Sequence, residues 1–270
     1  SSSSASSSPW SPDASTASKG NPVFRAELIK LKRSTTWLIA LALPLLAVTT
    51  GTINLANNPE ALDAGWASFT SQVTLFYGLL FYSIGIGLLA ATAWRMEHRG
   101  TNWNLLLTTT RKPITLVLAK IAIIAIPVAF MQLVLVAGAL ISGMLILRLD
   151  GDIPWQFALV GAIAVIAALP LIAIQSLLSM LLRSFAAPVA ICLVGCIIGV
   201  ATVTSEALRP LSYVLPQAIN TRALNLGSTA LAGSGGLTLG DTLPMLGVAL
   251  TLTILIVALT LSSVCTIKLK

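Results

Sequence analysis

Six long apolar runs divide this chain, and most of its charged residues lie between them. The runs cover residues 36–56, 69–93, 114–147, 155–182, 186–203 and 243–267. A helix of about 20 apolar residues crosses the hydrocarbon core of a bilayer, and it satisfies its own backbone hydrogen bonds there. Charged residues make up 9% of the chain, against about 25% in an average soluble domain. The pattern predicts an all-α membrane protein with six transmembrane helices.

The charges indicate how these helices are oriented. If both termini lie on one side of the membrane, 13 of the 16 lysines and arginines fall on that side. Because lysine and arginine accumulate in cytoplasmic loops, we predict that both termini are cytoplasmic (N-in/C-in). The net charge of +7 has the same origin, since the cations sit at the ends of apolar runs. Nucleic acid is therefore not expected as a partner.

The segment before the first run has two parts. Residues 1–21 are rich in serine and lack the basic start and apolar core of a secretory signal, so we predict a disordered tail. In residues 22–35 apolar side chains recur at helical spacing among cations, which predicts an interfacial helix that contacts membrane lipid. The alternative is a simple cationic flank of the first span. The residues of interest are Phe24, Glu27, Leu28, Lys30, Leu31 and Arg33.

Residues 94–113 form a strongly charged interruption between two runs and hold the only histidine. We predict a cytoplasmic loop to which a partner protein binds. Its tryptophan and leucines suit apolar anchors, and its cations suit charge complementarity. A compatible alternative is that the cations only determine topology and the tryptophan only sits at the membrane surface. The candidate contact residues are Glu97, His98, Arg99, Gly100, Trp103, Leu105, Leu106, Arg111 and Lys112. We expect Glu97 to pair with Arg99 or another neighbour, or to cap a helix.

Residues 204–241 are predicted to be an extracytoplasmic loop that is rich in glycine and serine toward its end. Its first half keeps enough apolar residues for a short helix, either on the surface or re-entrant. Just before it, Gly195 and Gly199 form a GxxxG pair. This spacing lets helices approach closely, and a dimer contact is one interpretation of it, although the spacing also occurs by chance.

The sequence contains no recognisable catalytic, metal-binding or nucleotide-binding motif. It has no GxxxxGK[ST] phosphate-binding loop, and one histidine cannot supply a metal or catalytic cluster. Its three cysteines lie in apolar runs, where packing is their usual role. No acid lies deep in a span, which disfavours a secondary carrier, and Gln132 and Gln175 are interpreted as inter-helix hydrogen bonds. We expect no catalysis, metal or cofactor on this chain, so a partner would have to supply energy.

Three features resemble the permease subunits of ABC-2 type exporters: the sequence AELIKLKRSTTW before the first span, the six-span plan, and the loop EHRGTNWNLLLTTTRKPITLVLAK. That loop is similar to the one between spans two and three of lantibiotic self-immunity permeases. Those loops have a glutamate, then glycine and tryptophan, a leucine pair, a basic turn and a lysine at the next span. The matching positions are Glu97, Gly100, Trp103, Leu105, Leu106, Arg111 and Lys120. Asn104 and Thr108 depart from the basic residue and the proline expected there.

The resemblance implies an ABC-2 (type V) exporter permease fold in a bacterial cytoplasmic membrane. It implies an ABC ATPase partner that holds ATP and Mg, a coupling helix within residues 94–113, and a second permease chain that is either identical or a paralogue. The implied function is expulsion of a lantibiotic or similar amphipathic antimicrobial peptide, which gives self-immunity and antibiotic resistance. The alternatives are an ABC-2 exporter of another drug, lipid or polymer, and a membrane scaffold or sensor subunit that transports nothing.

Overall fold

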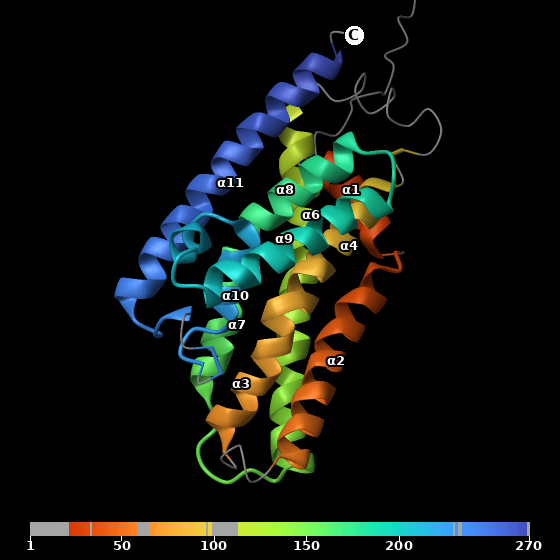
Figure 1. The fold of residues 1–270 in the computed structure, drawn as a ribbon. Helices are drawn as coiled ribbons and strands as arrows, with labels where there is room; N and C mark the ends of the chain where they lie inside the picture. Colours follow the sequence, from red (N-terminus) through yellow and green to blue (C-terminus); the bar gives the residue numbers. More distant parts are fainter. Residues whose placement is uncertain are drawn as a thin grey trace, which may run out of the picture.

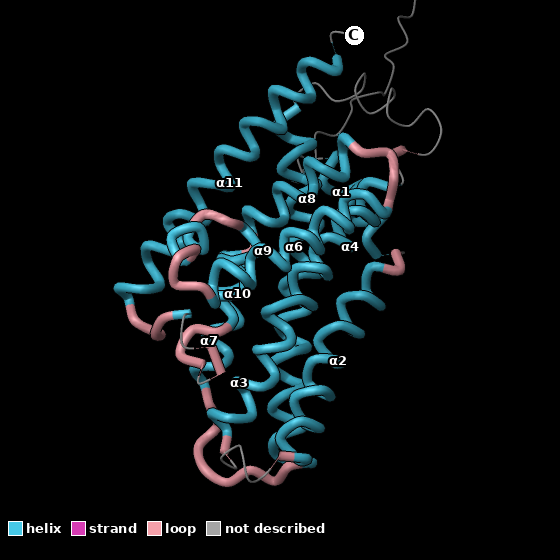
Figure 2. Tube along the Cα trace, in the orientation of Figure 1, coloured by secondary structure: helices cyan, strands magenta, loops and turns pink. Residues whose placement is uncertain are grey.

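The computed structural model of this chain consists of helices joined by loops, with no strand in the parts that it describes (Figures 1 and 2). These parts are residues 22–32, 34–58, 65–95, 97–98, 113–228, 230–231 and 234–268. In chain order the helices are α1 (Pro22–Lys32), α2 (Thr36–Asn57), α3 (Trp66–Phe76), η1 (Tyr77–Phe81), α4 (Tyr82–Arg95), α6 (Pro113–Ile141), η2 (Ser142–Ile146), α7 (Trp155–Ala167), α8 (Leu169–Leu181), α9 (Ala186–Thr204), η3 (Arg209–Tyr213), α10 (Pro216–Leu224) and α11 (Leu239–Lys268).

The six predicted spans are confirmed. Six helical segments in the described part of the chain are long and apolar enough to cross a membrane. They are Thr36–Asn57, Trp66–Arg95, Pro113–Ile146, Trp155–Leu181, Ala186–Thr204 and Leu239–Cys265, so each lies within a few residues of its predicted run. Figure 1 shows α1 and the C-terminal end of α11 at the same end of the molecule, as an even number of crossings requires.

Two of the spans are interrupted within the bundle. Span two changes from α3 to a π-helical turn, η1, and then to α4. Span four breaks at Ala168 between α7 and α8, where Pro170 occupies the first turn of α8. Proline has no amide hydrogen and its ring clashes with the preceding turn, which explains the break. Span three is long because it continues into a second π-helical segment, η2.

The segment after span five folds back into the bundle. Helix α10 packs against α9, α7 and η1, and residues 218–224 are all buried. Thr221 donates a hydrogen bond to the carbonyl oxygen of Gly78 in η1, at 2.9 Å. This part of the loop therefore packs inside the helical bundle and does not lie on its surface.

Glycines on the neighbouring helices allow α10 to pack closely against them. A Cβ atom placed on Gly199 would lie 3.1 Å from the backbone nitrogen of Ala218, and one on Gly195 would meet the side chain of Gln217. On the opposite wall, a Cβ on Gly78 would lie 2.7 Å from Nδ2 of Asn225. The GxxxG pair thus serves a contact inside one chain, which supplies a reason for its spacing that needs no dimer.

Candidate functional site

A fully buried lysine stands at the predicted cytoplasmic end of span three. Lys120 lies two turns into α6 and is 0% exposed. Its Nζ atom lies 2.7 Å from Oε2 of Glu27 and 2.8 Å from Oε1 of Glu97. It also donates a hydrogen bond of 3.1 Å to the carbonyl oxygen of Ala93 and sits 5.1 Å from the ring centroid of Trp94. A buried cation needs such partners, because an isolated charge in a low-dielectric interior is very unfavourable.

A second lysine completes the group. The Nζ atom of Lys30 lies 2.8 Å from Oε1 of Glu27 and 2.7 Å from Oε1 of Glu97. We call Glu27, Lys30, Glu97 and Lys120 the ionic cluster. It contains two acids and two bases, so its formal charge is zero, and three of its four side chains are buried. Residues far apart in the chain, on α1, after α4 and on α6, are thereby held in one contact.

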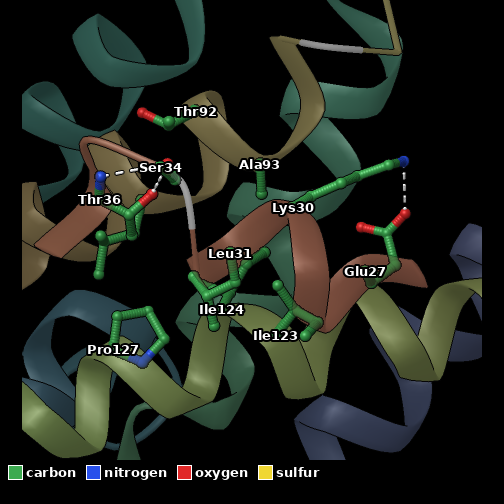
Figure 3. A pocket seen from close by; sticks show the side chains of 11 residues that line it. Glu27, Lys30, Leu31, Ser34, Thr36, Thr92, Ala93, Ile123, Ile124 and Pro127 are labelled. Atoms are coloured by element: carbon green, nitrogen blue, oxygen red, sulfur yellow. Dashed lines mark hydrogen bonds and ion pairs between the residues drawn. The ribbon is translucent and has the colours of Figure 1, made fainter. Parts of the chain in front are cut away.

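Local sequence explains how α1 supplies its half of the cluster. Glu27 and Lys30 are three residues apart, so they share one face of the helix. Figure 3 shows both side chains extending from α1, with a dashed line between them that marks their ion pair. Leu31 is buried on the side toward a small cavity of about 30 Å³, which Ile123 and Ile124 of α6 also line. The carbonyl oxygen of Leu31 accepts a 3.1 Å hydrogen bond from Nε1 of Trp37, which ties α1 to span one.

The cluster shifts the pKa of two of its members, Glu97 and Lys30. Burial by itself would raise the pKa of Glu97, but the neighbouring Lys120 and Lys30 outweigh it and lower that pKa below its usual value. Burial would likewise lower the pKa of Lys30, and its hydrogen bonds to Glu27 and Glu97 reverse this and raise it. Each partner therefore favours the charged form of the other.

A second set of contacts ties the same segment to span four. Nε1 of Trp94 donates a 2.8 Å hydrogen bond to Oγ of Ser176. Nε2 of His98 lies 2.7 Å from the carbonyl oxygen of Ser179. Both partners lie on α8, on the other side of α4 from α1. Trp94, Glu97 and His98, at the start of the predicted loop, thus anchor it to α1, α6 and α8.

The predicted residues of the interfacial helix differ in how deeply the structure buries them. Leu31 is buried, Phe24 is half-buried and Leu28 is 36% exposed, so the three apolar positions do not share one environment. Glu27 and Lys30 join the ionic cluster, although the sequence suggested only surface charges. Arg33 lies outside the described residues.

Of the predicted coupling residues, Glu97 and His98 are described and lie close to each other at the anchored start of the loop. Glu97 pairs with Lys30 and Lys120, neither of which had been expected as its partner. The other candidates lie outside the described residues; these are Arg99, Gly100, Trp103, Leu105, Leu106, Arg111 and Lys112.

Sequence reasoning missed the structural role of Lys120 and the serines of α8. Lys120 had been counted as a topology signal. Its position inside an apolar run, with two glutamates predicted on the same side of the membrane, was the available clue. Gln175 was expected to form an inter-helix hydrogen bond, yet within the described part of the chain its buried amide has no hydrogen-bond partner. No group of three histidine, cysteine or acidic side chains that could hold a metal occurs among the described residues.

Comparison with known proteins gives one match. Residues 23–199, about two thirds of the chain, match the family described as ABC-2 family transporter protein. The matched region begins in α1 and ends in α9, so it contains the whole ionic cluster. No curated protein and no solved structure matches the chain.

Proposed function

Because the chain belongs to the ABC-2 family of transporter proteins, a family of membrane permease subunits of ABC transporters, we propose that it forms the membrane half of an ATP-driven exporter. It is a multi-pass protein of the cytoplasmic membrane that works with an ABC ATPase, and it is a transport subunit rather than an enzyme. In this proposal ATP and Mg are bound by the ATPase, whose conformational cycle drives the permease.

The ionic cluster is the observation that carries the proposal. An ATPase beneath the membrane must move several spans together if it is to change access to a pathway. We infer that it contacts the loop after His98, whose start is anchored to α1 and α6 by Glu97 and to α8 by His98. A rigid, water-poor contact transmits displacement better than a flexible one, because packed interiors are dense and only slightly compressible.

For the cargo, we propose an amphipathic peptide of the lantibiotic type. A cavity of about 510 Å³ at the predicted extracytoplasmic end supports this class. Trp66, Trp155 and Phe157 line it together with several hydroxyl groups, and Asp152 is its single charged lining residue. Aromatic walls suit the apolar side of an amphipathic ligand, the hydroxyl groups suit its polar side, and one carboxylate favours a cation. Another drug, lipid or polymer remains the alternative cargo.

We further propose that a second permease chain, identical or a paralogue, completes the pathway. Spans one, five and six are the least buried within this chain, with 33%, 33% and 22% of their central windows covered. Their apolar outer faces are available either to lipid or to a second set of six spans.

The test begins with purification of the tagged full-length chain from its native membrane. We expect an ATPase with a phosphate-binding loop in stoichiometric amount, and its reproducible absence would contradict the proposal. The purified complex is then reconstituted and ATP-dependent movement of a fluorescent lantibiotic is measured, with an ATPase variant unable to hydrolyse ATP as the control. An intact complex that moves neither peptide, drug nor lipid would favour the scaffold or sensor alternative. Transport of a drug or lipid but not of the peptide would support the exporter function and replace the proposed peptide cargo.

A further inference from the structure

A second cavity lies at the same end as the ionic cluster, on the far side of α4. It measures about 190 Å³ and lies between the end of α4 and the turn that joins α8 to α9. Figure 2 shows this turn as a loop at the end of the molecule that also carries α1. The polar and aromatic residues that line it are Arg95, His98, Ser179, Arg183, Ser184 and Phe185.

The cavity carries positive charge that nearby acids do not balance. Among the described residues, neither Arg95 nor Arg183 forms an ion pair. Arg95 instead stacks its guanidinium 5.5 Å from the ring centroid of Phe185. The two described glutamates at this end, Glu27 and Glu97, are already paired within the ionic cluster.

The sequence of the adjoining loop adds to this imbalance. Residues 99–112 contain Arg99, Arg111 and Lys112 and no acid. On the predicted cytoplasmic side the one remaining acidic side chain is Asp13, within residues 1–21. The arginines of the cavity are therefore available to bind an anion from outside the chain.

The position of the cavity identifies the source of that anion. It lies where spans two, four and five reach the predicted cytoplasmic surface, which is the level of lipid headgroups. From this end α9 runs into the membrane with Ile191, Val194 and Ile198 exposed by 45%, 56% and 48%. These positions recur at helical spacing, so they form an apolar strip that can contact acyl chains.

We propose that this cavity binds the phosphate group of an anionic phospholipid of the cytoplasmic leaflet. Guanidinium groups form paired hydrogen bonds with phosphate oxygens, and basic pockets between spans on the cytoplasmic side suit acidic headgroups. The volume equals that of about six water molecules in liquid water, so it has room for a phosphate group and the adjoining glycerol. The inference uses the predicted orientation and is independent of the cargo and of the ATPase contact.

The experiment uses the full-length chain in phosphatidylcholine vesicles that contain a photoactivatable phosphatidylglycerol. The yield of crosslinked protein is measured while unlabelled phosphatidylglycerol or phosphatidylcholine competes. We expect phosphatidylglycerol to compete and phosphatidylcholine not to. Arg95→Gln and Arg183→Gln should each weaken competition by about five-fold, which corresponds to about 1 kcal/mol per cation near the membrane surface.

Matched variants separate the site from general surface charge. Arg25→Gln removes an exposed cation of α1 at the same end and should leave competition within about two-fold of the unmodified chain. The double variant Arg95→Lys with Arg183→Lys keeps both charges and should retain most of the binding. Arg95 and Arg183 are exposed, so the variants should fold, and an unchanged thermal midpoint confirms this. Equal competition in the unmodified chain and in the double variant Arg95→Gln with Arg183→Gln would overturn the proposal.

Two further measurements test whether the bound anion comes from a lipid. Inorganic phosphate at about 10 mM, compared with chloride at equal ionic strength because salt screens exposed charges, should not reduce the crosslink. If it abolishes the crosslink, the site takes a soluble phosphate and the lipid proposal is wrong. Addition of the ATPase should also leave the crosslink in place. Its loss on assembly would assign the arginines to an acidic surface of the ATPase instead.

Discussion

The side chains of Lys120 and Glu97, 23 residues apart in the chain, meet at 2.8 Å in the buried end of the helical bundle. The lysine belongs to span three and the glutamate follows span two. Their contact closes the loop between these spans at its base. Glu27 and Lys30 extend the same contact to α1.

Replacement of Lys120 should be strongly destabilising. Lys120→Met leaves Glu27 and Glu97 buried with only Lys30, and breaking a buried pair in this way costs about 3–5 kcal/mol. Lys30→Met is the matched control, because the Lys30 side chain is 32% exposed and its loss should be milder. The double variant Lys120→Met with Glu97→Gln restores charge balance and should recover part of the lost stability. Thermal unfolding in detergent measures all three, and equal midpoints for Lys120→Met and the unmodified chain would refute the role of the cluster.

The cluster should make stability depend on acid pH. The pKa of Glu97 lies below its usual value of 4.5 in the folded state, so its contribution is fully present above pH 4.5. It is lost as pH falls from 4.5 through the lower folded-state pKa, because the unfolded chain binds the proton first. Glu97→Gln should start from a lower midpoint and show a shallower fall across this window. Parallel midpoint curves for both proteins would argue against the shift.

The close packing of α10 against Gly199 predicts that replacing this glycine lowers the stability of the protein more than replacing a glycine elsewhere. Gly199→Leu should force α10 away, since the new side chain meets the backbone of Ala218, and overpacking costs about 1–3 kcal/mol. Gly247→Leu on α11 is the control, because a Cβ atom there meets nothing within 4 Å. Thermal unfolding and the oligomeric state are measured together. A changed oligomeric state with unchanged thermal stability would indicate that the glycine pair serves a dimer instead.

The proposed ATPase contact is tested within the loop itself. Trp103→Ala combined with Leu106→Ala should reduce export while ATP hydrolysis by the assembled complex continues, because apolar anchors dominate the energy of a protein interface. Asn104→Ala in the same loop is the control. Membrane insertion is checked by the amount of folded complex recovered. Normal export by the double variant would show that the contact lies elsewhere.

The cavity near Asp152 predicts a charge preference in the cargo. Asp152→Asn removes its single charged lining residue and should weaken export of cationic peptides more than export of neutral analogues. The expected loss is two- to five-fold, or about 0.5–1 kcal/mol for one exposed interaction. Asp150→Asn, two residues away and also exposed but not lining the cavity, should have no effect. An equal loss in both variants would attribute the effect to surface charge alone.

The six spans could be predicted from the sequence because hydropathy is a local property of about 20 consecutive residues. Each predicted run, from Thr36 to Cys265, became a helix with nearly the same limits. The break of span four next to Pro170 was not predicted from the sequence. Glu97 and His98 were likewise recognised in the sequence as an interruption of the apolar pattern, and their role in coupling stays a prediction.

Only the tertiary structure decided what those charges and glycines contact. Lys120 is a lone cation in an apolar run when read along the chain, and its two carboxylate partners lie 23 and 93 positions away. Gly195 and Gly199 allow a close approach by any helix, and nothing in their spacing names α10 as that helix. Local sequence can specify which segments enter the membrane, because burial in lipid depends on each segment's own composition. It cannot specify which segments meet, because that depends on packing between residues distant in the chain.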